Sequence, residues 1–231
     1  MIDGGLFITG TDTEVGKTWV SCALLDALHH AGVSAFGLKP VAAGAQRIDG
    51  ALRNDDAQAL MLHSSPTIAY EAVNPVLLQG AVAPHIAAHW EQRELSLAEL
   101  ADHCRHQLQA RTGIALVEGA GGWRVPLNAR ECLSDLAIAL ALPVVMVVPI
   151  RLGCLNHAML TAEAIARDGL PLVGWVANMV RSEYVPSDML IETLAQRLGA
   201  PCLAQIPLYS GDYSPSLSKL PSPSVPYVDL P

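Results

Sequence analysis

The sequence has little charge for its length, and its basic residues do not cluster. Its 231 residues include 14 Lys and Arg against 22 Asp and Glu, so the formal net charge is −8 at pH 7. A nucleic-acid-binding protein generally needs grouped Lys and Arg side chains to neutralise phosphates. We therefore expect no nucleic-acid partner.

Long uninterrupted apolar runs are also missing. Apolar residues form 51% of the chain, but the longest run, residues 136–150, is broken by Pro143. That run is too short to cross a hydrocarbon core of ~30 Å as a continuous helix. We expect a soluble protein with no membrane partner.

Paired cysteines and complete zinc motifs are absent from the sequence. The five cysteines are odd in number, none has Cys-x-x-Cys spacing, and the first residues do not form a signal peptide. We expect reduced cysteines and a cytoplasmic location. His85 and His89 have the i, i+4 spacing of a zinc pair. Because no third ligand accompanies them, we interpret both as structural or surface residues.

What the sequence does contain is an alternation of short apolar runs with segments of helical period. The predicted strands cover residues 6–9, 34–40, 114–119, 143–149, 171–178 and 201–207. The predicted helices cover residues 17–31, 96–111, 133–141, 155–168 and 187–198. Because the strands lack polar alternation, helices should cover both faces of the sheet. The pattern predicts a doubly wound α/β fold with a mainly parallel sheet.

Two segments depart from this alternation. Residues 41–95 contain one helical run, DDAQALMLHS, followed by a Pro- and Ala-rich stretch. Residues 210–231 are rich in Ser and Pro and lack periodicity, which predicts an irregular tail. No linker-like composition interrupts the rest of the chain, so residues 1–231 are predicted to form a single domain.

A phosphate-binding loop is predicted between the first strand and the first helix. The stretch TGTDTEVGKT has five residues between Gly10 and Gly16, whereas the usual pattern has four. Backbone N–H groups of the turn and the positive end of the helix would face the phosphates. Lys17 would reach the β- and γ-phosphates, and the Thr18 hydroxyl would bind Mg²⁺.

Two carboxylates are candidates to complete a Mg²⁺ site, because this cation prefers oxygen ligands. Glu118 ends the strand IALVE at the predicted carboxyl edge of the sheet, although a solvated strand-end carboxylate is the alternative. Asp56 is either a second ligand or the N-cap of the helix that it begins. Lys39, just before Pro40, is either directed toward the same edge or a surface lysine at a strand terminus.

The stretch RLGCLNHA offers a further binding position. Asn156 and His157 follow a glycine where a helix is predicted to start. A helix N-terminus can bind a carboxylate through its backbone N–H groups. An ordinary N-terminal turn is the alternative.

Taken together, these motifs resemble those of the dethiobiotin synthetase family. They occur in its order and spacing across residues 6–209: TGTDTEVGKT, LKPVAAG, RNDDA, NPV, APHIA, LVEGAGGW, RLGCLNHAMLTAEAI, GWVAN and IP. The five-residue gap in the phosphate loop is one mark of that family. The resemblance implies an ATP- and Mg²⁺-dependent ligase of biotin biosynthesis that converts 7,8-diaminononanoate and CO₂ to dethiobiotin. It also implies a homodimer with the substrate site near the subunit interface.

The resemblance further implies roles for individual residues. The catalytic residues would be Lys39, Lys17 and Thr13. The nucleotide-binding residues would be Glu14, Val15, Gly16, Lys17, Thr18, Trp19, Asp56, Glu118, Gly119, Ala120, Gly121, Asn178, Met179, Pro207, Leu208 and Tyr209. The substrate-binding residues would be Thr13, Lys39, Ala43, Gly153, Cys154 and Asn156, the last three for the carboxylate bound by the neighbouring subunit. The metal ligands would be Thr18, Asp56 and Glu118.

Three positions differ from the family pattern. Ala43 stands where many members have Ser or Thr, Met179 where an aspartate is frequent, and Leu190 where the family has a tyrosine. The differences at Ala43 and Leu190 bear on substrate affinity, and the difference at Met179 bears on nucleotide preference. None of them removes a charge assigned to catalysis.

Other classes of protein share a phosphate loop. An ATPase switch of the partitioning and septum-placement type usually has a second lysine early in the loop, and residues 11–15 contain none. Such proteins often end in a basic amphipathic tail, whereas residues 210–231 have one lysine and no helical period. A glutamine-dependent ligase acting on a cobalamin precursor needs a second domain, for which the chain is too short. A non-catalytic nucleotide-binding module is the remaining alternative.

Overall fold

The central element of the fold is a six-stranded parallel sheet. The computed structural model describes residues 4–48, 50–180 and 186–208. The strand order is β10-β9-β8-β1-β7-β2. The strands are β1 (Gly5–Gly10), β2 (Ala35–Leu38), β7 (Ile114–Gly122), β8 (Val144–Pro149), β9 (Leu172–Asn178) and β10 (Cys202–Ile206). All five neighbouring pairs are parallel, which confirms the predicted sheet.

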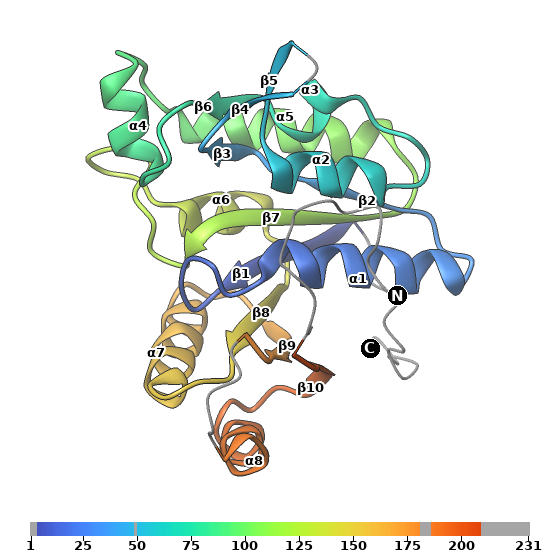
Figure 1. Cartoon of the computed structure of the whole chain (residues 1–231), viewed down its shortest axis with the longest axis vertical. Helices are drawn as coiled ribbons and strands as arrows, with labels where there is room; N and C mark the ends of the chain where they lie inside the picture. The colour runs from blue at the N-terminus through green and yellow to red at the C-terminus, as the bar shows by residue number, and fades with distance from the viewer. Residues whose placement is uncertain (1–3, 49, 181–185, 209–231) are drawn as a thin grey trace.

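Helices cover both faces of this sheet, as its apolar strands require. The helices that cover the sheet are α1 (Lys17–His30), α5 (Leu97–Ala110), α6 (Leu133–Leu140), α7 (Cys154–Arg167) and α8 (Ser187–Arg197). Figure 1 shows α1 in front of the sheet and α5 and α6 behind it, with α7 and α8 beside the lower strands. The predicted helices and strands are all present, with ends shifted by a few residues at most.

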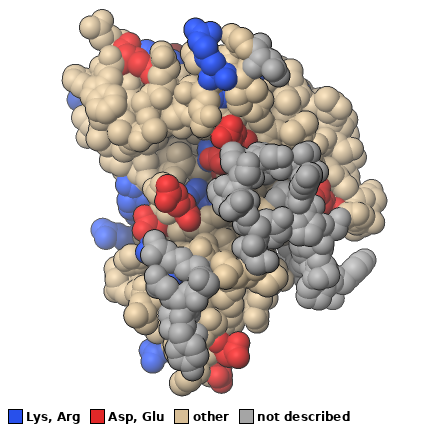
Figure 2. Space-filling model, viewed as in Figure 1, with Lys and Arg blue, Asp and Glu red and all other residues tan. Residues whose placement is uncertain are grey.

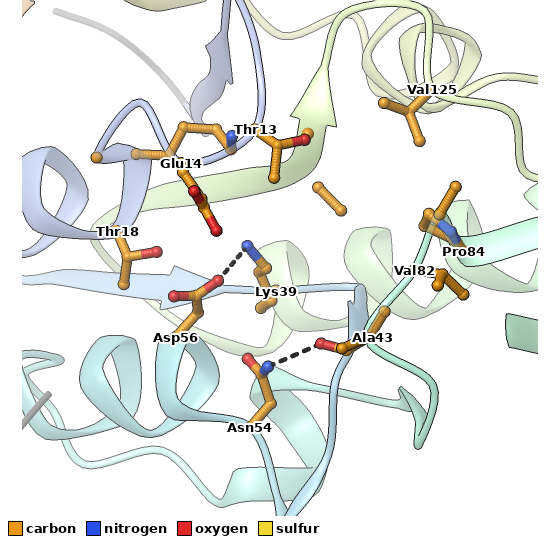
Figure 3. A pocket seen from close by; sticks show the side chains of 16 residues that line it. Thr13, Glu14, Thr18, Lys39, Ala43, Asn54, Asp56, Val82, Pro84 and Val125 are labelled. Atoms are coloured by element: carbon orange, nitrogen blue, oxygen red, sulfur yellow. Dashed lines mark hydrogen bonds and ion pairs between the residues drawn. The ribbon is translucent and has the colours of Figure 1, made fainter. Parts of the chain in front are cut away.

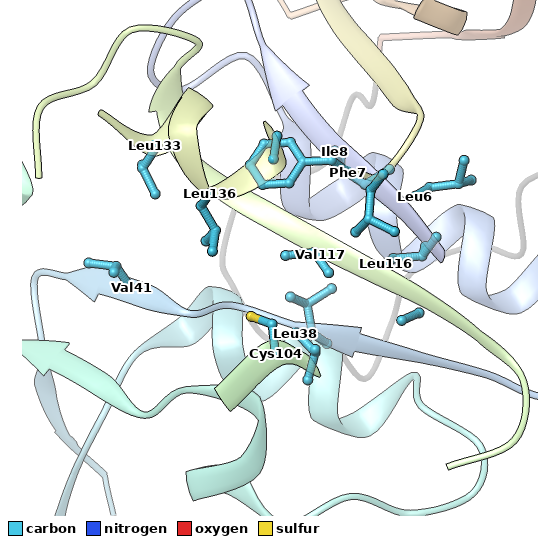
Figure 4. Packing of buried hydrophobic residues seen from close by; sticks show 14 of the residues in the cluster. Leu6, Phe7, Ile8, Leu38, Val41, Cys104, Leu116, Val117, Leu133 and Leu136 are labelled. Carbon is cyan, nitrogen blue, oxygen red and sulfur yellow. The ribbon is translucent and has the colours of Figure 1, made fainter. Parts of the chain in front are cut away.

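The core fills the space between these layers. All six residues of β1 are buried, and so are all six of β8. Figure 4 shows Leu6, Phe7 and Ile8 of β1 beside Leu116 and Val117 of β7, with α6 supplying Leu133 and Leu136. A second cluster of buried side chains, which includes Trp175 of β9, packs α7 and α8 against the other half of the sheet. Strands with two apolar faces are therefore held by helices on both sides.

The segment from residue 41 to residue 95 forms an extra layer beside β2. It contains α2 (Asp55–Leu62), α3 (Tyr70–Val73), α4 (Pro84–Trp90), β3 (Val41–Ala43), β4 (Gln46–Ile48), β5 (Ala51–Arg53) and β6 (Val76–Leu78). Strands β3 and β6 pair in parallel, and β4 and β5 form an antiparallel hairpin. The sequence predicted only α2 in this segment, because helices of one or two turns and strands of three residues are too short to display a period.

The topology places the loops that matter for function at one edge. The strands of a parallel sheet all end at the same edge, where such folds bind ligands. In Figure 1 that edge faces left, where the loop between β1 and α1 lies between α4 above and α7 below. No helix in the described part of the chain has both the length and the apolar character needed to span a bilayer. The predicted tail, residues 210–231, lies outside the described residues.

Candidate functional site

A cavity of about 540 Å³ opens at the carboxyl edge of the sheet. Figure 2 shows the surface hollowed there, with acidic and basic side chains gathered around the hollow. Its lining comes from the loop after β1 and the first turn of α1, the residue after β2, the segment of residues 41–95, and the end of β7 with the loop that follows it. The lining residues are Thr13, Glu14, Gly16, Lys17, Thr18, Lys39, Ala43, Asn54, Asp56, Ala81, Val82, Ala83, Pro84, Ala120, Gly121 and Val125.

The loop between β1 and α1 wraps around the ammonium group of Lys17. Lys17 Nζ donates to the backbone carbonyl of Asp12 at 3.1 Å. At Gly10 an added Cβ would lie 2.5 Å from Val15 Cγ2 and 3.2 Å from Lys17 Nζ, so the curl leaves no room for a side chain there. Glu14 has a φ of 57°, a left-handed conformation that is uncommon for residues other than glycine. Such a strained turn is typical of loops that cradle a ligand.

A cluster of buried charges lies beside this loop. Lys39 Nζ donates to Glu118 Oε1 at 2.6 Å and to Asp56 Oδ2 at 3.0 Å. Glu118 is fully buried and also accepts hydrogen bonds from the hydroxyls of Thr18 at 2.8 Å and Ser21 at 2.7 Å. Figure 3 shows Lys39 and Asp56 facing each other across the floor of the cavity, near Thr18 and Glu14. Groups from four separate segments therefore meet at one point.

The charges in this cluster shift each other's pKa values. Burial lowers the pKa of Lys17 to about 8, and the nearby charge of Lys39 adds to the effect. Burial also acts to lower the pKa of Lys39, but the carboxylates of Asp56 and Glu118 outweigh it and raise that pKa above its ordinary value. Lys39 in turn lowers the pKa of Asp56 against the effect of burial. Strongly perturbed groups that meet in a cavity are typical of functional sites.

The oxygen atoms of Thr18, Asp56 and Glu118 fit a small divalent cation. The Thr18 hydroxyl is 2.8 Å from Glu118 Oε1, and both Asp56 and Glu118 bind the Lys39 ammonium. Mg²⁺ prefers oxygen ligands and usually takes only one or two carboxylates, completing its shell with phosphates and water. The described residues contain no group of three or more His, Cys, Asp or Glu side chains that could hold a metal ion. The donors present suit Mg²⁺ bound together with a nucleotide.

The geometry decides two alternatives that the sequence left open. Asp56 is not the N-cap of α2, because Asn54 takes that position and its side chain accepts from the N–H of Ala57 at 3.2 Å. Lys39 is not a surface lysine, since only 3% of it is exposed. Both side chains are instead directed into the cluster.

Other residues predicted for the site lie at its margins. Asn178, at the end of β9, donates from Nδ2 to the carbonyl of Val15 at 2.9 Å, and an added Cβ at Gly16 would collide with this amide. Gly119 is buried, and its carbonyl accepts from Lys39 Nζ at 3.3 Å. Trp19 lies in the first turn of α1 and packs against the core. Asn178 therefore contacts the phosphate loop, Gly119 contacts the charged cluster, and Trp19 packs against the core.

The remaining predicted residues do not line this cavity. Gly153 is the N-cap of α7, Cys154 is buried in its first turn, and Asn156 is exposed. Met179, Pro207 and Leu208 follow the ends of β9 and β10, and Tyr209 lies outside the described residues. Arg151 connects the α7 loop to the phosphate loop, because its Nη2 atom is 3.1 Å from Asp12 Oδ2.

The structure also brings in residues to which the sequence assigned no role. Residues 81–84 and Val125 form an apolar wall of the cavity, opposite the charged cluster in Figure 3. Ser21 binds Glu118, and Asn54 donates to the carbonyl of Ala43 at 3.3 Å. The motif APHIA contains residues 83–87, so its presence was a signal for this wall. Ser21 gave no signal, because a serine in a helix has many possible roles. His85 and His89 lie on α4 and do not line this cavity, and His89 is exposed.

Solved structures with the same fold place the chain in a broad class. It superposes on a ParA family ATPase from Chlorobium tepidum with a TM-score of 0.52 and 11% identity, covering 90% of this chain and 86% of that one. It also superposes on the septum site-determining protein MinD from Pyrococcus horikoshii, solved with Mg-ADP, with a TM-score of 0.52 and 18% identity, covering 88% and 81%. At these identities the likeness concerns the fold alone. The fold and the phosphate loop define a P-loop α/β protein.

Sequence comparisons identify the family within that class. The chain is 56% identical over 204 residues to the ATP-dependent dethiobiotin synthetase BioD of Cellvibrio japonicus, covering 88% of this chain and 89% of that protein. It is 54% identical over 201 residues to the protein of the same name from Pseudomonas paraeruginosa, covering 87% and 88%. A family model described as an AAA domain matches residues 4–211. The chain belongs to the dethiobiotin synthetase family, whose members are ATP-dependent ligases.

Proposed function

We propose that this protein converts 7,8-diaminononanoate, CO₂ and ATP to dethiobiotin, ADP and phosphate, with Mg²⁺ as the metal, in the cytoplasm. The observation that carries the proposal is the convergence of two lysines, Lys17 and Lys39, on one cavity between a phosphate loop and an apolar wall. The reaction joins two anions, a carbamate and a phosphate. Cationic groups held in fixed positions lower the cost of bringing such anions together.

The proposed reaction has three steps. One amine of the substrate attacks CO₂ and loses a proton, which forms a carbamate. A carbamate oxygen then attacks the γ-phosphorus of ATP and ADP leaves, which forms a carbamic-phosphoric anhydride. The second amine attacks the carbonyl carbon of this anhydride, loses a proton and expels phosphate, which closes the ureido ring.

Each charged group has a distinct role in this proposal. Lys17 binds the phosphates of ATP from within the phosphate loop, together with the N–H groups of residues 14–18. Lys39 holds the carbamate oxygens against the γ-phosphate, and Thr13, on the rim of the cavity, contacts the substrate. Thr18, Asp56 and Glu118 would hold Mg²⁺, which when bound would supply positive charge to the phosphates. None of these groups acts as a nucleophile, so catalysis depends on position and charge.

The apolar wall suits the rest of the substrate. Diaminononanoate has two adjacent amines on a long alkyl chain, and the amines must lie near Lys39. Val82, Pro84 and Val125 face this side of the cavity in Figure 3, so they would contact methylene groups next to the amines. Ala43 also lines the cavity but lacks the hydroxyl that many family members have there.

Residues at the ends of β9 and β10 are proposed to bind the base and the rest of the nucleotide. Asn178 lies directly behind the phosphate loop, where an amide can both donate to and accept from a base edge. Met179 follows Asn178 directly, and Pro207, Leu208 and Tyr209 follow β10, the strand that pairs with β9. Gly119, Ala120 and Gly121, after Glu118, would line the path of the phosphates. We also propose that residues 1–231 form one domain, because the described sheet includes strands from both ends of the chain.

A homodimer would complete the substrate site. Gly153, Cys154 and Asn156 do not line the cavity of their own subunit; they lie at the N-terminus of α7, which would face the substrate carboxylate of a neighbour, although the Cys154 N–H also donates to the carbonyl of Arg151 at 3.1 Å. Leu152 beside them is 76% exposed and Leu160 on α7 is 56% exposed. Exposed apolar side chains of this size are common in subunit interfaces. Light scattering on the purified protein should give twice the mass of the chain, and Leu160→Glu should reduce it to that of the monomer.

The experiment that tests the proposed reaction follows two products in one sample. The purified protein is incubated with Mg·ATP, bicarbonate and 7,8-diaminononanoate, and ADP and dethiobiotin are measured together. The proposal predicts equal amounts of the two products, and neither when the diamine is omitted. Steady ADP release without the diamine would contradict it and would favour an ATPase switch.

A further inference from the structure

A short helix beside the cavity fixes the backbone of Lys39. The N–H of Lys39 donates to the carbonyl of Val73, the last residue of α3, at 2.8 Å. The carbonyl of Lys39 accepts from Asn74 Nδ2 at 2.7 Å. The same Asn74 amide also donates to the carbonyl of Val76 at 3.0 Å. Lys39 follows β2 directly and is not paired with a neighbouring strand among the described residues. Val73 and Asn74 therefore provide the hydrogen bonds to its backbone that a neighbouring strand would otherwise provide.

The hydroxyl of Tyr70 connects this anchor to the helix that carries Asp56. It accepts the N–H of Asn54 at 2.8 Å and donates to Asn74 Oδ1 at 3.2 Å. Asn54 caps α2, and Asp56 lies in the first turn of α2. The three polar side chains are largely shielded from water, with exposed fractions of 6% for Tyr70, 8% for Asn54 and 3% for Asn74. One hydroxyl therefore joins the main chain of Lys39 to the N-terminus of α2.

We propose that Tyr70 is a positioning residue, whose hydroxyl sets the separation of Lys39 and Asp56 across the floor of the cavity. This inference rests on the proposed function, in which Lys39 holds the carbamate and Asp56 binds the metal. The two side chains belong to different segments, and besides their own ion pair each must reach its own ligand. The Tyr70 bridge connects their backbones and involves neither side chain.

A second buried hydroxyl offers a matched control. Ser64 Oγ accepts the N–H of Gly37 in β2 at 2.9 Å and donates to the carbonyl of Leu60 in α2 at 2.6 Å. It thus joins β2, the strand that Lys39 follows, to the same helix, but its partners do not line the cavity. Losing either hydroxyl leaves one buried N–H without its partner, which costs similar stability. Only the loss at Tyr70 should disturb the spacing of Lys39 and Asp56.

The test compares Tyr70→Phe with Ser64→Ala in the full-length protein. Tyr70→Phe keeps the ring that lies 4.2 Å from the Arg53 guanidinium, so it should fold. We expect its kcat to fall about tenfold, the range typical of groups that orient a metal ligand, with KM for ATP changed less than about twofold. Ser64→Ala should keep kcat within about twofold at a similar loss of thermal stability. Asn74→Ala, which removes the Lys39 end of the bridge, should reproduce the kcat loss.

A binding measurement separates this inference from the proposed reaction. Calorimetric titration with ADP, with and without Mg²⁺, needs no diamine and no turnover. Tyr70→Phe should reduce the affinity gained from Mg²⁺ several-fold and leave binding of ADP alone unchanged, whereas Ser64→Ala should change neither. If the wild type lacked diamine-dependent turnover, the proposed function would fail, while this titration would still decide the role of Tyr70. Equal effects of the Tyr70 and Ser64 variants in both assays would reduce Tyr70 to a structural residue.

Discussion

Two clusters of charged side chains differ in their exposure to water: one includes Glu118 of β7, and the other includes Arg124 of the loop after β7. The cavity cluster consists of Lys39, Asp56 and Glu118, with the last fully buried. The loop cluster joins the loop after β7 to Asp168, the C-cap of α7. Asp168 accepts from Trp123 Nε1 at 2.8 Å and from Arg124 Nη2 at 2.7 Å. The Arg124 side chain in it remains 48% exposed. Only the first cluster removes its cation from water.

The difference indicates where the protein gives up stability for function. Taking charges out of water costs free energy that their mutual attraction only partly offsets, so a buried cluster is weak evidence of stabilisation. The loop cluster incurs less of that cost, because the Arg124 side chain stays 48% exposed, and it holds the residues after β7 against the end of α7. The cavity cluster adds Lys17, a second cation with a lowered pKa, to the same place. Such an arrangement stabilises a bound anion rather than the free protein.

The largest effect is expected from Glu118→Gln in the cavity cluster. Glu118 accepts from Lys39, Thr18 and Ser21, and an amide cannot accept all three bonds or balance the lysine charge. Diamine-dependent turnover should fall by about 10²–10³, and the free energy of unfolding should fall by about 3 kcal/mol. Product assays and urea unfolding measure the two quantities. Turnover within about tenfold of the wild type would show that the buried carboxylate is not part of the site.

An intermediate effect is expected from pH acting on Lys17. Its pKa of about 8 in the free protein should rise when phosphate binds, because the ammonium then gains an opposite charge. Below pH 8 the group is already protonated and ADP affinity should be level. Above pH 8 binding must take up a proton, so affinity should fall by up to about tenfold per pH unit. Calorimetry between pH 7 and 9.5 measures the ADP affinity, and an affinity that stays level throughout would contradict the role of Lys17 in binding phosphate. Lys17→Met should abolish the slope.

The smallest effect is expected from Asp168→Asn in the loop cluster. The free energy of unfolding at pH 7 should fall by about 1 kcal/mol, the scale of one charge-assisted hydrogen bond, with turnover nearly unchanged. Against the effect of burial, the bonds from Arg124 and Trp123 lower the pKa of Asp168. The stabilisation is therefore present above an unfolded pKa of about 3.9 and is lost as pH falls through the lower folded value. In urea unfolding, the difference between wild type and variant should begin to shrink below about pH 4 and vanish below the folded pKa of Asp168, and a difference that did not shrink as pH fell would contradict this account.

Much of the fold could be predicted because its signals are local. The apolar runs of β1, β8 and β9 and the periods of α1, α5 and α7 depend on neighbouring residues only. The phosphate loop could be placed for the same reason, since its strand, turn and helix are consecutive. The carboxyl edge followed from the parallel sheet, which placed Glu118 near the loop.

The part that could not be predicted depends on contacts between distant segments. Lys39 and Glu118 are 79 positions apart, and the burial of Lys39 results from α2 and α3, which fold over the end of β2. Those elements belong to the segment of residues 41–95, whose strands of three residues show no period. Asn54 and Asp56 both suit a helix N-terminus, so only the geometry shows which is the cap and which faces the cavity.

The most direct test of the account is the activity of Lys39→Ala, measured beside that of Asp168→Asn. Each variant removes one charge from one of the two clusters, and ADP titration shows whether each still binds nucleotide. The account predicts that Lys39→Ala binds ADP but makes dethiobiotin about 10³-fold more slowly, whereas Asp168→Asn keeps nearly full activity. Dethiobiotin formation by folded Lys39→Ala at a rate within about tenfold of the wild type would contradict the central claim that the buried cluster is the catalytic site.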